Sequence, residues 1–84
     1  MDSLEANGKI YNLTPHASRN MQKRRITEAM VVEVLQTVES WQQEDTGRDV
    51  YQYSVQNSKG RWVKVRVIVE EENLLIITIM EYFS

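Results

Sequence analysis

The hydrophobic pattern of the chain repeats about every 3.6 residues in its first half and every two residues in its second half. Thr14-Pro15 predicts a helix start, with threonine as N-cap and proline at the first helical position. Ala17 and Met21 form a narrow apolar side of this helix. Arg24 falls on the same side, so we expect its guanidinium to anchor the helix on an acid or a free carbonyl.

A second helix is predicted over roughly residues 28–39, with Thr27 as its N-cap. Its apolar stripe comprises Met30, Val31, Val34, Leu35 and Val38. After Trp41 the period changes to two, and short turns separate the apolar runs, which predicts an antiparallel meander of strands. These strands are expected over residues 50–56, 61–70 and 74–83, with a weak additional strand at about 41–45.

The predicted fold class is therefore α+β, with two N-terminal helices packed on one face of a three- to four-stranded antiparallel sheet. Residues 1–13 are expected to form a flexible N-terminal segment, and residues 14–84 a single domain. In the strand over 61–70, the alternation predicts that Lys64 and Arg66 point away from the helices. The residues that should face the helices are Val63, Val65, Val67 and Val69.

The composition narrows the classes of site that the chain can hold. It has no cysteine, which excludes disulfides and thiolate metal sites. Its one histidine and the divergent run Glu70–Glu72 give no converging ligand set, so we expect neither a metal nor a cofactor. Residues 1–10 lack the features of a secretory signal, and the apolar run Leu74–Met80 is too short to span a bilayer. We expect a cytoplasmic protein without a membrane partner.

The net charge of −2 and the pI of about 5.3 are unusual for a protein that grips nucleic acid by its phosphates. Most basic residues are nevertheless concentrated in two blocks that contain no acid. If the blocks meet in space, they form a positive patch on an acidic protein; alternatively, both are solvated faces near balancing carboxylates. The blocks are Arg19, Lys23, Arg24 and Arg25, and then Lys59, Arg61, Lys64 and Arg66.

The run His16-Ala17, Met21, Arg24, Ile26-Thr27 and Val31, followed by an all-β half, resembles the small bacterial DUF4258 family. The signature of that family is H-A-x-x-R-M-x-x-R-G-I-[ST], and the resemblance covers roughly residues 14–82.

This sequence departs from the signature at two positions. The arginine before the methionine is Asn20 here, with Arg19 one place earlier, so a role of that arginine does not transfer directly. The glycine before the isoleucine is Arg25, which leads us to expect a joint between the helices without a positive φ.

The resemblance implies a fold distantly similar to the RelE/ParE toxin group, in which a helix pair packs on an antiparallel sheet. Family function is largely unassigned, so an activity does not follow from the fold. The leading hypothesis is a protein-interaction or regulatory module in a toxin–antitoxin or related complex. Its partner would be an antitoxin, a neighbouring gene product or a second copy of the chain. Trp41 and Trp62 would then serve either as interface anchors or as lids on the core.

The alternative hypothesis is a RelE/ParE-like ribonuclease. RNA cleavage needs an acid and a base and cationic donors to the phosphate. The candidate catalytic residues are His16 as acid or base, Lys64 and Arg66 for phosphate, and Tyr51 as a hydroxyl donor. The candidate RNA-binding residues are Arg19, Lys23, Arg61 and Tyr53, and Tyr82 is a further stacking candidate. The competing reading of His16 is structural, with its ring bonded to a nearby carbonyl or carboxylate.

Overall fold

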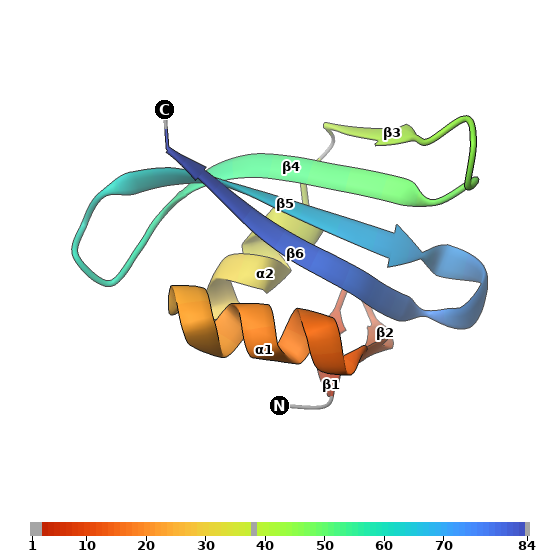
Figure 1. Ribbon diagram of the computed structural model, residues 1–84, viewed down its shortest axis with the longest axis horizontal. Helices are drawn as coiled ribbons and strands as arrows, with labels where there is room; N and C mark the ends of the chain where they lie inside the picture. Colours follow the sequence, from red (N-terminus) through yellow and green to blue (C-terminus); the bar gives the residue numbers. More distant parts are fainter. Residues whose placement is uncertain (1–2, 38, 84) are drawn as a thin grey trace.

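The computed structural model describes residues 3–37 and 39–83 of the chain. Within these ranges, six strands form one sheet in the order β1-β2-β6-β5-β4-β3, and both helices lie on the same face of it (Figure 1). The elements in chain order are β1 (Ser3–Ala6), β2 (Lys9–Leu13), α1 (Pro15–Arg24), α2 (Glu28–Leu35), β3 (Ser40–Gln42), β4 (Asp49–Gln56), β5 (Trp62–Glu70), the 3-10 turn η1 (Glu71–Asn73) and β6 (Leu75–Phe83).

The strands β3 to β6 form the antiparallel meander that the period of two predicts. The predicted sheet of three to four antiparallel strands is nevertheless wrong in two respects. The sheet has six strands, and it is mixed, because β2 runs parallel to β6 through the pairs Asn12↔Leu75 and Leu13↔Ile76.

The two additional strands lie in residues 1–13, which the sequence pattern predicts to be flexible. β1 and β2 form a hairpin around the two-residue turn Asn7-Gly8, whose φ values are 56° and 74°. Asparagine followed by glycine tolerates these left-handed angles and favours tight hairpins. The hairpin buries Leu4, Tyr11 and Leu13, which makes residues 3–13 part of the domain.

The predicted helix starts are confirmed. The Thr14 side chain accepts a hydrogen bond from the Ala17 amide, and Pro15 occupies the first helical turn. Thr27 caps α2 by accepting from the Met30 amide. α2 ends at Leu35 rather than near residue 39, and Val38 lies outside the described residues.

The joint between α1 and α2 corrects two expectations. Arg25 has φ 55° and ψ 38°, so the joint does use a left-handed residue although it is not glycine. The Arg25 amide donates to the Gln22 carbonyl and the Ile26 amide to the Met21 carbonyl, which is the Schellman pattern that requires this geometry. Arg24 is exposed and makes no ion pair within the described ranges, so it is not the predicted anchor.

The core lies between the helices and the inner face of the sheet. Met30, Val31, Val34 and Leu35 of α2 are buried there together with Ala17 and Met21 of α1. As the alternation predicts, the four odd-numbered valines from Val63 to Val69 are buried in this core. Lys64 and Arg66 consequently lie on the opposite face of the sheet.

Candidate functional site

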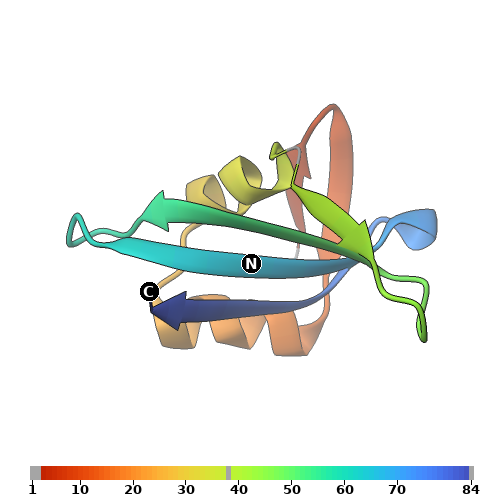
Figure 2. The same ribbon diagram turned by 90° about the horizontal axis from the view of Figure 1, so that it is seen from above.

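The outer face of the sheet carries no helix, as Figure 2 shows. Because paired residues of neighbouring strands share a face, the register defines which side chains lie there. We call this surface the open face. Its residues are Trp41, Val50, Gln52, Ser54, Gln56, Trp62, Lys64, Arg66, Ile68, Thr78, Met80 and Tyr82.

The centre of the open face is the guanidinium of Arg66. Its Cζ atom lies 5.3 Å from the centroid of the Trp41 ring and 5.1 Å from that of Tyr82. The Arg66 Nε atom also donates to the Gln52 Oε1 atom at 2.9 Å. Two aromatic rings and an amide thus hold the cation in place, and no carboxylate of the described residues neutralises it.

The rest of the open face is aromatic, cationic or neutral. Lys64 is exposed and is the register partner of both Tyr82 and Ser54. Trp62 is 61% exposed, Trp41 45% and Tyr82 40%. From Trp62 to Ile68, neither β5 nor its paired positions place a carboxylate on this face. The surface is therefore locally positive on a chain whose net charge is −2.

The two tryptophans differ in their surroundings. Trp41 is the register partner of Val50, and Val50 of Ile68. These two side chains are buried although no helix covers this face, so Trp41 borders a small apolar cluster and contacts Arg66 as well. Trp62 is too exposed to serve as a lid on the core.

His16 lies beside the free edge of β6, beyond the point where β2 ends. The Asn20 Nδ2 atom donates to the Ile79 carbonyl at 3.1 Å and lies 3.4 Å from the His16 Nε2 atom. The Thr14 hydroxyl donates to the Ile77 carbonyl at 2.7 Å. α1 therefore takes the place of a further strand, and Asn20, at the position of the signature arginine, satisfies an edge carbonyl of the sheet.

Tyr51 lies on the inner face, because it is the register partner of Val67, and the fold does not bring it to Lys64 and Arg66. Its hydroxyl donates to the Glu71 Oε1 atom at 2.8 Å, and the Tyr11 hydroxyl donates to the same atom at 3.0 Å. Lys9 lies 3.5 Å from the other oxygen of this carboxylate.

The pKa values of this cluster shift as its burial and hydrogen bonds require. Burial and then the hydrogen bond to Glu71 raise the pKa of Tyr11 to about 12, and the same causes raise the pKa of Tyr51. Burial alone would raise the pKa of Glu71, but the hydroxyl donors and the Lys9 charge outweigh it and lower that pKa. The cluster links β2, η1 and β4 and therefore stabilises the fold.

The remaining candidates lie elsewhere. Tyr53 is on the inner-face side and lines a shallow hollow beside α2 with Glu33, Gln36 and Thr37. Arg19 and Lys23 are exposed on α1. Arg61 directly precedes β5 in the β4–β5 turn, where it lines a pocket with Arg24, Arg25 and Lys59. The two basic blocks thus meet in part, while Lys64 and Arg66 belong to the open face.

The alternation in β5 predicts that Lys64 and Arg66 lie on the outward face, but no local pattern indicates that the rings of Trp41 and Tyr82 contact Arg66. Their sequence signal is limited to aromatic residues near the ends of the β-rich half. In the described ranges, no group of three or more histidine, aspartate and glutamate side chains is arranged to hold a metal ion. Neither helix there is long and apolar enough to cross a membrane.

Comparison with known proteins adds one finding to this geometry. No curated protein and no solved structure matches the chain significantly. Residues 13–81 match the model of the family described as "Domain of unknown function (DUF4258)", which covers both helices and most of the sheet. The chain therefore belongs to the DUF4258 family.

Proposed function

We propose that the protein binds single-stranded RNA on its open face. The observation that carries this proposal is the guanidinium of Arg66 held between the rings of Trp41 and Tyr82. Proteins that bind single strands combine aromatic platforms for the bases with cations that follow the backbone. Lys64 and the exposed indole of Trp62 extend this combination along β5.

Charge supports RNA over a neutral ligand. The open face presents two cations and no carboxylate between Trp62 and Ile68, while the chain as a whole is acidic. Negative charge elsewhere limits non-specific adsorption, so binding should favour this face and be sensitive to salt. Gln52, Ser54 and Gln56 add neutral donors and acceptors beside the cations.

The test is fluorescence anisotropy with a short fluorescein-labelled oligouridine. Trp62→Ala should weaken binding about tenfold or more, because one stacked base contributes roughly 1–3 kcal/mol. Lys64→Gln should lower the slope of log K against log salt by about 0.7, the share of one phosphate contact.

Two residues outside the open face, the exposed Ile10 and the partly exposed Arg48, provide matched controls. Ile10→Ala removes an exposed apolar side chain on β2, and Arg48→Gln removes a cation before β4. Both variants should bind as the wild type does. Equal losses in Trp62→Ala and Ile10→Ala, or no measurable binding by the wild type, would contradict the proposal.

RNA cleavage, as in the RelE/ParE group, is a second candidate, favoured by the place of His16. Through Asn20 its ring lies beside the edge of β6, the strand that separates it from β5 and Arg66. His16 would act as acid or base, and Lys64 and Arg66 would hold the phosphate. Strong induction should then arrest growth, and His16→Ala should restore growth without loss of RNA binding in vitro. Undisturbed growth would refute cleavage.

Protein interaction is the competing class, since tryptophan, tyrosine and arginine are also the residues that dominate protein interfaces. An antitoxin-like partner or a neighbouring gene product would then co-purify from the native host, and Trp62→Ala would weaken that association. A second copy of the chain would appear as a dimer by light scattering. Salt dependence separates the classes, because an interface of exposed aromatics changes little with salt whereas phosphate contacts do.

A further inference from the structure

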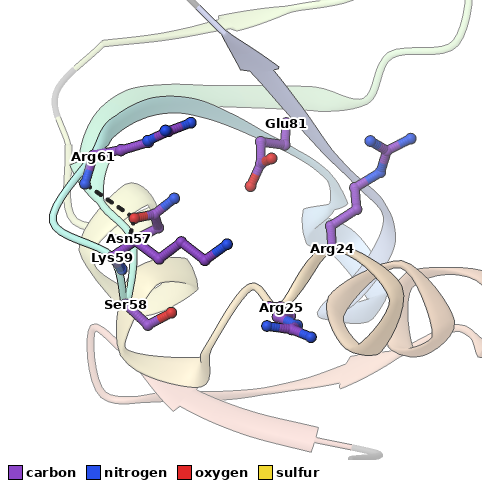
Figure 3. A pocket seen from close by; sticks show the side chains of 7 residues that line it. All are labelled: Arg24, Arg25, Asn57, Ser58, Lys59, Arg61 and Glu81. Atoms are coloured by element: carbon purple, nitrogen blue, oxygen red, sulfur yellow. Dashed lines mark hydrogen bonds between the residues drawn. The ribbon is translucent and has the colours of Figure 1, made fainter.

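A basic pocket lies at the end of the molecule where the β4–β5 hairpin approaches the α1–α2 joint. It has a volume of about 150 Å³, several times the roughly 30 Å³ that a water occupies in the liquid. Its lining comes from three separate parts of the chain (Figure 3). The lining residues are Arg24, Arg25, Asn57, Ser58, Lys59, Arg61 and Glu81.

The charges of this pocket are not balanced. Four cations and one carboxylate line it, a formal excess of three positive charges on a chain of net charge −2. None of the four cations forms an ion pair within the described part of the chain. In Figure 3, Lys59 and Glu81 extend toward the middle of the pocket, while Arg24 stands at the rim opposite the hairpin. Like charges held together without counter-ions favour a multiply charged anion.

The backbone that carries these cations is fixed on both sides of the pocket. The Asn57 Oδ1 atom accepts from the Lys59 amide at 2.9 Å and from the Arg61 amide at 3.0 Å, which fixes the hairpin turn. Across the pocket, Arg25 is fixed in the left-handed conformation by the Schellman bonds of α1. Glycine is favoured at such a position, so arginine here costs backbone strain. The same residue places a guanidinium at the pocket.

The pocket adjoins the open face around the end of the sheet. Glu81 and Tyr82 are successive residues of β6, so one lines the pocket and the other lies on the open face. In the same way, Arg61 of the hairpin precedes Trp62, the most exposed aromatic residue of the open face. A strand bound along the open face can therefore place its end in the pocket.

We propose that the basic pocket binds the phosphate monoester at the end of an RNA strand. The inference rests on the proposed function for the strand, while the anion site stands on the pocket itself. A terminal monoester carries between −1.5 and −2 charges at neutral pH, more than the single charge of an internal diester, so the excess of cations favours the end. Glu81 opposes the anion and limits its affinity.

The experiment compares three oligouridines of equal length, with a 5′-phosphate, a 3′-phosphate or hydroxyls at both ends. One of the two phosphorylated strands should bind the wild type about tenfold more tightly than the hydroxyl strand, the effect of one charge-assisted contact. Lys59→Gln combined with Arg61→Gln should abolish this difference. Glu81→Gln should enlarge it.

Two further variants locate the effect. Lys64→Gln on the open face should weaken all three strands alike and retain the preference for the phosphorylated end. Arg48→Gln should change neither quantity. If the two-site variant Lys59→Gln/Arg61→Gln does not fold, Glu81→Gln and Arg25→Gly still test the pocket, since Arg25→Gly should reduce the preference severalfold. A preference that is equal in all these variants would overturn the inference.

Inorganic phosphate separates failure of the pocket from failure of the proposed function. In a ¹⁵N-labelled sample, sodium phosphate should shift the amide signals of Gly60, Arg61 and Ile26, whereas sodium chloride of equal ionic strength should not. Phosphate shifts without binding of any strand would refute the RNA proposal and leave an anion site. Strands that bind equally with and without a terminal phosphate would refute end recognition. No shift and no end preference would overturn the pocket entirely.

Discussion

Replacement of Glu71 by alanine should loosen the attachment of the N-terminal hairpin to the sheet. The Glu71 Oε1 atom accepts from the hydroxyls of Tyr11 in β2 and Tyr51 in β4, at 3.0 and 2.8 Å. The register joins β2 to β6 through only two residue pairs. The carboxylate is therefore a second attachment of the hairpin, and its loss should affect β1 and β2 first.

The magnitude follows from the donors that would lose their acceptor. A hydrogen bond to a charged group contributes roughly 1.5–3 kcal/mol, and a buried group left unpaired costs a similar amount. Tyr11 is 1% exposed, whereas Tyr51 is half-buried and can regain water. Lys9 lies 3.5 Å from Glu71 with half of its side chain in solvent, so that pair adds less than about 1 kcal/mol. We expect Glu71→Ala to lower the free energy of unfolding by about 3 kcal/mol and Glu71→Gln by about 1.5 kcal/mol.

The measurement is urea unfolding followed by tryptophan fluorescence, with Glu72→Ala as the matched control. Glu72 is the next residue of η1, is exposed and makes none of these bonds. Hydrogen exchange should also show faster exchange of the β2 amides in Glu71→Ala than in the control. If Glu71→Ala and Glu72→Ala unfold within about 0.5 kcal/mol of each other, the hydroxyl–carboxylate bonds do not stabilise the fold as argued.

Four further changes probe pH, the helix joint and the edge of β6. Because the folded pKa of Tyr51 is raised, stability should fall once unfolded tyrosine ionises above about pH 10, and Tyr51→Phe should flatten this loss in alkaline urea titrations. The lowered pKa of Glu71 has the opposite effect on the pH dependence of stability. Stability should be lost below about pH 4.5 in the wild type but not in Glu71→Gln. Arg25→Gly should raise the free energy of unfolding by about 1 kcal/mol, because glycine adopts the φ of 55° at this position without the strain of a side chain. Asn20→Leu should lower the free energy of unfolding by about 1–2 kcal/mol, because the Ile79 carbonyl would lose its side-chain donor. Urea unfolding measures the effect of both substitutions.

The features that the sequence predicts well are those specified by neighbours along the chain. Thr14 and Thr27 cap helices because their side chains reach amides three residues ahead. The alternation in β5 orients its valines and Lys64 because one strand suffices to define its two faces. These features depend on residues a few positions apart and can be predicted without the tertiary structure.

At two places the sequence carries a local signal that its surroundings weaken. Asn7-Gly8 is a strong hairpin signal, yet the flanking strands have only four and five residues and their apolar alternation is brief. At Arg25 the residue type argues against a positive φ, but the position requires one. The helix end determines the backbone angle there, because the amides of Arg25 and Ile26 must reach carbonyls of the last turn.

The parallel pairing of β2 with β6 is of a different kind. It joins Asn12 and Leu13 to residues more than sixty positions away, and no turn connects the two strands. α1 follows β2 directly and continues along the edge of β6, so the pairing depends on how the helix packs. A periodicity along the chain does not indicate which distant segments pair, so this contact is known only from the structure.

The candidate site shows why a face is predictable while a set of neighbours is not. Alternation places Arg66 outward within β5, but only the register of β6 decides that Met80 and Tyr82, rather than Ile79 and Glu81, flank it. A slip of one residue would put the carboxylate of Glu81 beside the guanidinium and turn a cation between aromatic rings into an ordinary ion pair. The extra β6 residue opposite Ile68/Val69 is one such irregularity, confined to the far end of the strand. The chemistry of the open face therefore depends on pairing that the buried valines of β5 and the isoleucines of β6 enforce from the other side of the sheet.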